Sequence, residues 1–192
     1  MDARTLVDAL ALWEGTGTAV AHAAQMVSGL LTDHGIPNLM AGGLAVQLHG
    51  YPRTTVAVDI VVPDVEKAHA FLVANGYQAS ARQPLAVVDP TRRVKIDLLP
   101  AGKCLRADCE VPFPELPKTG AIMQPVTLET LISLKLDSWK HSQARRIKDR
   151  ADVAELIMRN ELPRDLKVHR AVSEEYLALW DALAAEEPGP AT

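Results

Sequence analysis

Aromatic residues are scarce in this chain, at 4% of its 192 residues, and it contains only two cysteines. With so few rings, a hydrophobic core must be built mainly from Leu, Val, Ile and Ala. The cysteines, Cys104 and Cys109, have no histidine or further cysteine nearby in the sequence. This isolated pair argues against a zinc site and a disulfide framework, so we expect inert thiols and a cytoplasmic protein.

Long apolar runs and an excess of positive charge are also absent. No stretch approaches the roughly 18 apolar residues of a membrane-spanning helix, so we expect no contact with a membrane. The N-terminal segment mixes acidic and basic side chains, unlike a signal peptide. The formal net charge of −4 argues against a dedicated nucleic-acid coat protein, although it leaves room for a local basic groove.

The length fits one domain, or a core with a helical appendage. The pattern predicts N-terminal helices over 1–35, an α/β core over 36–125, a helical region over 126–186 and a frayed tail over 187–192. Helices are expected at 3–14, 18–34, 44–49, 65–75, 127–140, 143–159 and 172–185, and strands at 38–42, 55–62, 77–81, 85–89 and 93–99. This order predicts an α/β fold in which helices flank a small mixed sheet, with a C-terminal helical bundle.

The most informative run follows the N-terminal helices. Gly42 and Gly43 separate a short strand from a helix, and glycines let backbone N–H groups approach an anion such as phosphate closely. The next strand carries Asp59 in an otherwise apolar stretch, where a carboxylate is costly unless it is paired or binds a metal. Strand alternation places Ala57 and Asp59 on one face.

A second carboxylate, Asp97, has apolar neighbours in the strand expected at 93–99. Two aspartates on adjacent strands that face one cleft are suited to Mg²⁺, which binds through one or two carboxylates plus substrate phosphates. The simpler alternatives are that Asp59 is a structural carboxylate paired with Arg53 or Lys95, and that Asp97 is an edge-strand charge. Together with the glycine turn, the two carboxylates favour a nucleoside triphosphate (NTP) site.

In their order along the chain, these residues resemble the minimal nucleotidyltransferase superfamily, which has the DNA polymerase β-like fold, and most closely the AbiEii-type toxin nucleotidyltransferases. That family has a Gly-Gly turn, a helix, an Arg-x-Thr-x-Asp-h-Asp strand and a third Asp on a later strand. The matching positions are Gly42, Gly43, Arg53, Thr55, Ala57, Asp59 and Asp97. The likeness continues through Lys135, Lys148, Asp149 and Asp152, and covers about residues 36–160.

The resemblance implies transfer of a nucleoside monophosphate from Mg²⁺–NTP to an acceptor hydroxyl, with two metal ions in an active form. The implied roles are phosphate cradling by Gly42 and Gly43, nucleotide binding by Arg53 and Thr55, metal binding by Asp59 and Asp97, phosphate contact by Lys135 and Lys148, and site organisation or proton acceptance by Asp149. Without the resemblance, Lys135 would be interpreted as a snorkelling lysine on a buried helix.

The chain departs from the family pattern at Ala57, where the family has an aspartate that bridges two metal ions. Loss of this carboxylate is expected to leave NTP binding partly intact but to cripple phosphoryl transfer. Because the surrounding residues still match, the favoured interpretation is a disabled form with an engineered Asp-to-Ala change. A natural pseudoenzyme is the alternative.

The acceptor stays open between several classes. The AbiEii-type resemblance implies a tRNA 3′ end or a protein hydroxyl, and a cognate antitoxin as partner, whereas other superfamily members modify aminoglycosides or lincosamides. RNA is slightly favoured by a cluster of basic residues at Lys140, Arg145, Arg146, Lys148 and Arg150, and disfavoured by the acidic net charge. The competing function classes are a non-catalytic nucleotide-binding module and an interaction domain without a ligand.

Overall fold

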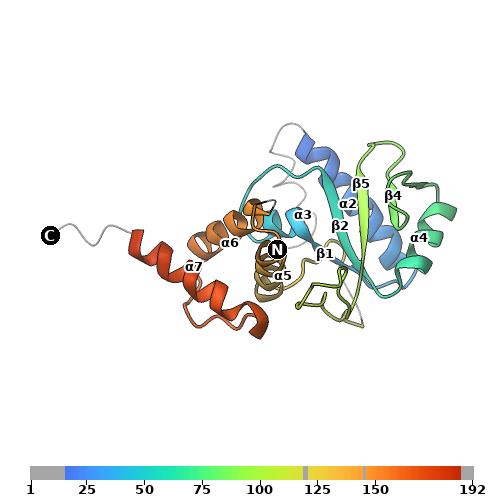
Figure 1. The fold of residues 1–192 in the computed structure, drawn as a ribbon. Helices are drawn as coiled ribbons and strands as arrows, with labels where there is room; N and C mark the ends of the chain where they lie inside the picture. The colour runs from blue at the N-terminus through green and yellow to red at the C-terminus, as the bar shows by residue number, and fades with distance from the viewer. Residues whose placement is uncertain (1–15, 119–120, 145, 187–192) are drawn as a thin grey trace.

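The computed structural model describes residues 16–118, 121–144 and 146–186, which form an open mixed sheet with helices on both faces (Figure 1). The helix expected at 3–14 and the tail expected at 187–192 lie outside these residues. Among the helices that the structure describes, none combines the length and the apolar character needed to span a bilayer.

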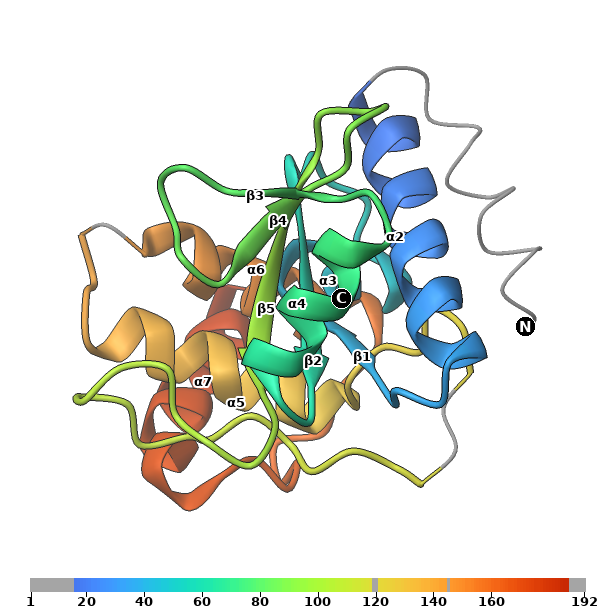
Figure 2. The same cartoon turned by 90° about the vertical axis from the view of Figure 1, so that its right-hand side faces the viewer.

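The sheet has the strand order β1-β2-β5-β4-β3 (Figure 2). The strands are β1 (Leu39–Ala41), β2 (Ala57–Val62), β3 (Gln78–Ala79), β4 (Ala86–Val88) and β5 (Lys95–Pro100). The central pair, β2 and β5, is parallel, and the other pairs are antiparallel. The prediction of an α/β fold with a small mixed sheet is therefore confirmed, with each strand somewhat shorter than expected.

The helices are α2 (Thr16–Asp33), α3 (Gly42–Leu48), α4 (Val65–Ala74), α5 (Leu128–Lys140), α6 (Ile147–Arg159) and α7 (Ser173–Glu186), with a 3-10 turn at Arg170–Val172 before α7. All of them begin within two residues of the expected position except α6, which begins four residues later than expected. Helix α3 begins at Gly42, so the glycine pair lies in its first turn rather than before it. Helix α6 begins at Ile147, and its N-cap Arg146 lies outside the helix with a ψ of 21° and donates its N–H to Ser142 O at 2.9 Å.

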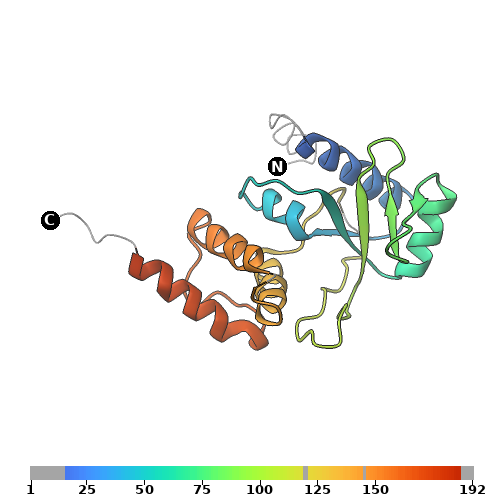
Figure 3. The same cartoon turned by 45° about the horizontal axis from the view of Figure 1, so that its top comes forward.

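The two faces of the sheet have different covers. Helices α2 and α4 lie on one face, and α5, α6 and α7 lie on the other (Figure 3). The face beneath α2 and α4 is apolar along its whole length, with a core that includes Val58, Ile60, Val62, Ile96 and Leu98.

The opposite face of the sheet is divided into an apolar and a polar part. Val61 and Leu99, toward the ends of β2 and β5, belong to the core that includes α5, α6 and α7. Ala57 and Asp59 lie on the same face nearer the start of β2 and are only partly buried. The C-terminal helices thus cover the apolar part and leave a cleft over the polar part.

The chain crosses to the C-terminal helices along the edge of β1. Met40 N–H donates to Gln124 O at 2.7 Å, and Val126 N–H donates to Met40 O at 2.9 Å. This segment then enters α5 at its N-cap Thr127, whose hydroxyl accepts from Thr130 N–H at 3.3 Å. The backbone pairing with β1 therefore fixes where α5 starts against the sheet.

A buried hydroxyl connects three segments that hold β1 in place, and it provides a stability test. Ser28 Oγ donates to Asn38 Oδ1 at 2.7 Å and accepts from Met123 N–H at 2.8 Å. The variant Ser28→Ala leaves both partners buried without this bond, so we expect a loss of about 1–3 kcal/mol in the free energy of unfolding. Urea denaturation would measure it. Ser80→Ala, which removes only two long loop contacts at 3.3 and 3.4 Å, should change the midpoint much less.

Candidate active site

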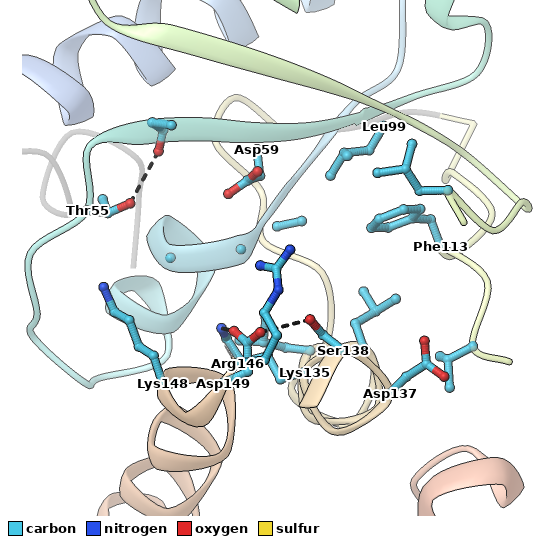
Figure 4. A pocket seen from close by; sticks show the side chains of 18 of the residues that line it. Thr55, Asp59, Leu99, Phe113, Lys135, Asp137, Ser138, Arg146, Lys148 and Asp149 are labelled. Atoms are coloured by element: carbon cyan, nitrogen blue, oxygen red, sulfur yellow. Dashed lines mark hydrogen bonds and ion pairs between the residues drawn. The ribbon is translucent and has the colours of Figure 1, made fainter. Parts of the chain in front are cut away.

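A cleft of about 600 Å³ opens between the polar part of the sheet and the helices α5 and α6 (Figure 4). Thr55 and Lys148 lie toward one end of the view, and Leu99 and Phe113 lie toward the other. The polar lining includes Gly42, Gly43, Arg53, Thr55, Asp59, Lys135, Arg146, Lys148 and Asp149. The cleft therefore gathers most of the predicted site residues, and Asp97 is not among those that line it.

The glycine pair makes room for side chains that come from β2 and the loop before it. Gly42 has a φ of +56°, and a Cβ on it would overlap the carboxylate of Asp59. A Cβ on Gly43 would lie 2.7 Å from Thr55 Oγ1 and 2.8 Å from Arg53 Nη2. The backbone N–H of Gly43 lowers the pKa of Asp59, against the larger effect of burial. Both glycines are thus required by the close approach of these side chains.

The two predicted carboxylates stand opposite each other. In the parallel pairing of β2 and β5, Asp59 is the partner of Asp97, and Ala57 is the partner of Lys95. Burial, followed by repulsion from Asp97, raises the pKa of Asp59 to about 6. The site therefore concentrates negative charge that lacks full compensation.

Asp59 does not form the ion pairs that the simple structural alternative expected, because Arg53 and Lys95 each pair with another carboxylate. Lys95 Nζ lies 2.8 Å from Asp97 Oδ2, and Arg53 Nε lies 2.8 Å from Asp152 Oδ1. Among the described residues, none forms an ion pair with Asp59, which leaves this carboxylate available to a cation.

A charge cluster joins the loop before β2 to the helices α5 and α6. Asp152, which is 1% exposed, receives Arg53 and also Lys135 Nζ at 2.6 Å. Lys135 Nζ lies 2.9 Å from Asp149 Oδ1, and Ser138 Oγ donates to Asp149 Oδ2 at 2.8 Å. Lys135 is thus held between two carboxylates, and both oxygens of Asp149 are engaged.

Arg146 and Lys148 are exposed residues that line the cleft. No ion pair involves either of them within the part of the chain that the structure describes. The expected basic cluster is divided, because Lys140 pairs with Glu110 at 3.1 Å and Arg150 lies over the ring of Trp139 at 5.5 Å. Arg145 lies outside the described residues.

The loop between β5 and α5 forms the apolar end of the cleft, where Leu105, Val111 and Phe113 line it. The structure pairs Cys104 with Cys109 as a disulfide within this loop. The expectation of free, inert thiols is wrong here, because the turn between the cysteines brings their Cα atoms to 5.7 Å, within the range of a disulfide.

Polar contacts dock this loop on α5. Glu110 N–H donates to Asp137 Oδ1 at 3.0 Å, and Arg106 Nη2 lies 3.9 Å from Asp137 Oδ2. Ligand atoms of Glu110, Asp137 and His141 lie within 4.8 Å of one another, a spacing that a metal ion tolerates. Because Arg106 and Lys140 already supply positive charge to these carboxylates, the cluster is explained by docking of the loop.

Sequence reasoning assigned no role to Asp137 or Ser138. Asp152 belonged to the family likeness, and the structure buries it as the shared partner of Arg53 and Lys135. Ser138 follows Lys135 by three positions, so it lies on the same helix face as a residue that was assigned. This spacing is the signal that would have found Ser138.

The donor set fits one divalent cation better than two. Asp59 and Asp97 offer hard oxygen ligands at facing positions, and Mg²⁺ takes one or two such carboxylates together with substrate phosphates. Ala57 offers no ligand for a second ion. A metal ion at Asp97 would have to displace Lys95 from Oδ2 or lie close to its positive charge.

A scan against protein-family models and a search of curated proteins both give no match. Two solved structures of ANT(2″)-Ia share the fold. The crystal structure of its complex with adenylyl-2″-tobramycin has a TM-score of 0.50 at 12% identity, over 88% of this chain and 98% of that chain. The solution structure of this antibiotic-resistance factor has a TM-score of 0.51 at 12% identity, over 89% and 95%.

This chain has a nucleotidyltransferase-like fold. The likeness covers most of both compared chains and therefore extends well beyond the five short strands of the sheet. This fold is the one that the sequence resemblance implied, and the likeness does not single out AbiEii-type members. At this identity it is evidence about the fold alone.

Removal of the carboxylate at the centre of the charge cluster should destabilise the protein strongly. Asp152→Ala leaves Arg53 without its carboxylate and Lys135 with only one, so we expect a loss of about 3–5 kcal/mol in the free energy of unfolding. Chemical denaturation would measure it. Asp181→Ala breaks an exposed pair with Arg164 and serves as the control. Equal, small effects of both variants would contradict the central role of Asp152.

The raised pKa of Asp59 predicts a pH-dependent effect of its removal. The folded-state pKa of about 6 lies above the ordinary 3.8, so ionisation of Asp59 disfavours the folded state as the pH rises through this window. Asp59→Asn should therefore stabilise the protein by up to about 3 kcal/mol at pH 7.5 and have little effect near pH 4. Thermal unfolding across this range would measure the difference, with exposed Asp33→Asn as the control. A gain that is the same at every pH would rule out this cause.

Proposed function

We propose that this protein binds an NTP with a divalent cation in the cleft, as enzymes that transfer a nucleoside monophosphate to a hydroxyl group do. The observation that carries the proposal is the facing pair Asp59 and Asp97, beside a cleft that also exposes Arg146 and Lys148. The shared fold of ANT(2″)-Ia supports the reaction class. Such a reaction joins the acceptor oxygen to the α-phosphorus, breaks the bond to the β-phosphate oxygen and releases pyrophosphate.

Each part of the cleft has a role in this proposal. Asp59 and Asp97 would hold the cation, which neutralises phosphate charge when bound. Arg146 and Lys148 would bind the triphosphate, since they are exposed and their charges are not used in ion pairs with the described residues. The space beside Gly42 and Gly43 is filled by Asp59, Thr55 and Arg53, so any phosphate contact would come from the backbone N–H groups in the first turn of α3.

Lys135 and Asp149 are better suited to organising the cleft than to reacting. Lys135 would have to leave one of two carboxylates to reach a phosphate, at 2.9 Å from Asp149 and 2.6 Å from Asp152. Asp149 would accept a proton from the acceptor only after losing a hydrogen bond from Lys135 or Ser138. We therefore assign both residues to positioning α5 and α6 around the substrate.

The lining of the cleft favours a small acceptor with an apolar face. A volume of about 600 Å³ is typical of a small-molecule site. One end is lined by Leu99, Leu105, Val111, Phe113, Leu131 and Leu134. Basic residues outnumber acidic residues in the lining of the cleft, and this excess of positive charge does not suit a polycationic acceptor. The basic residues are Arg53, Arg106, Lys135, Arg146 and Lys148, and the acidic ones are Asp59, Asp137 and Asp149. The tRNA, protein and antitoxin hypotheses gain no support from the divided basic cluster.

A non-catalytic nucleotide-binding module is the second candidate, and Ala57 favours it. The methyl group of Ala57 stands on the strand face of Asp59, where the family has a bridging carboxylate. In an enzyme, its loss would slow transfer while leaving the contacts that bind NTP. The two candidates therefore differ in what happens when a carboxylate is installed at this position.

Ala57→Asp should create or restore transfer. We expect Mg²⁺-dependent transfer from labelled NTPs to rise by roughly 100-fold or more, the scale at which one group that stabilises the transition state acts. The acceptor panel would include an aminoglycoside, a lincosamide and total tRNA, with the unchanged chain assayed in parallel.

Ala57→Asn is the matched control for this experiment, because it adds similar bulk without a charge, and it should stay at background. NTP binding would be measured separately for each variant by equilibrium dialysis. Tight binding without any transfer by Ala57→Asp would overturn the enzyme hypothesis for these acceptors and favour the non-catalytic module. Absence of NTP binding in every variant would contradict both candidates.

A further inference from the structure

Four residues form a compact square on the polar part of the sheet. Ala57 and Asp59 lie on β2, and their partners Lys95 and Asp97 lie on β5 in the parallel register. Alternation puts all four on one face of the sheet. Two carboxylates, one ammonium group and one methyl group thus share the place where the family pattern expects three carboxylates.

The ammonium group of Lys95 is placed by two oxygen acceptors. Its Nζ lies 2.8 Å from Asp97 Oδ2 and 2.9 Å from Gln83 Oε1 in the loop before β4. The side chain of Lys95 is 39% exposed and that of Asp97 is 21% exposed. The pair is therefore open to solvent and can exchange partners, and Gln83 can retain the ammonium group if Asp97 is taken.

Charge balance on this square differs from that of a site with two metal ions. Asp59 and Asp97 together carry two negative charges, and Lys95 places one positive charge next to Asp97. The other nearby cation, Lys135, is already held by Asp149 and Asp152. A divalent ion that binds Asp97 must therefore displace Lys95 or remain close to its positive charge, which costs binding energy.

We propose that Lys95 is an internal cation of this site, which neutralises Asp97 in the metal-free protein and competes with a divalent ion for that carboxylate. The inference rests on the proposed function, in which Asp59 and Asp97 hold the ion. It makes the protein a weak binder of divalent ions when no nucleotide is bound.

Mn²⁺ alone is the probe that tests this proposal, with free ion measured by electron paramagnetic resonance in the absence of nucleotide. Lys95→Met should tighten Mn²⁺ binding by at least about tenfold, because it removes a positive charge beside the ligand. Lys95→Arg keeps the charge and should bind like the unchanged chain. Lys67→Met is the matched control, since Lys67 forms a similar pair with Asp64 at 3.1 Å on the exposed surface of α4.

A double variant shows whether the gain depends on Asp97. Lys95→Met combined with Asp97→Asn should lose the increase in Mn²⁺ affinity, and circular dichroism would establish that each variant is folded. If Lys95→Met perturbs folding, Lys95→Gln provides the same loss of charge with a polar side chain. Unchanged or weaker Mn²⁺ binding by the folded charge-removal variant would overturn the proposal, as would an increase that survives in the double variant.

The same variants separate this inference from the proposed function. Binding of labelled ATP would be measured by equilibrium dialysis, with and without Mn²⁺. Tighter Mn²⁺ binding by Lys95→Met without ATP binding by any variant would sustain the role of Lys95 and contradict the proposed function. ATP binding with no effect of Lys95→Met on Mn²⁺ affinity would support the proposed function and contradict the role of Lys95.

Discussion

The buried carboxylate of Asp152 is the contact on which the arrangement of the site depends. It lies on α6 and receives Arg53 from the loop before β2 and Lys135 from α5, at 2.8 and 2.6 Å. A buried charge is costly unless it is paired, so Asp152 favours the arrangement in which these three segments lie together. The charge cluster places Arg53 beside Gly43 and lies next to the apolar core that packs the C-terminal helices on the sheet.

That closure turns one face of the sheet into both core and cleft. Val61 and Leu99 are covered by the C-terminal helices, while Ala57 and Asp59 on the same face remain partly exposed. The apolar end continues from Leu99 into the loop that the disulfide closes, and the polar end continues to the glycine pair. An NTP and an acceptor with an apolar face would find different surroundings within one cavity.

The charges at the floor of the cleft follow from four residues at paired positions of β2 and β5. With alanine at position 57, repulsion within the carboxylate group is reduced, and Lys95 balances Asp97. Asp59 is the group left without an ion pair among the described residues, which agrees with its raised pKa. The metal-free site therefore keeps one carboxylate without full compensation, and under the proposed function nucleotide phosphates would strengthen its affinity for a cation.

The sequence by itself determined the order of helices and strands, the mixed sheet, and the sharing of one face by Ala57 and Asp59. Strand alternation follows from local backbone geometry, and the fold class follows from hydrophobic periodicity, so both are visible without a structure. Only the tertiary structure decided that Arg53 and Lys135 bind Asp152, that Lys95 binds Asp97, and that the glycines make room for side chains of β2. A long basic side chain can reach several carboxylates of equal charge. Which ion pair it forms depends on which helices and strands pack together.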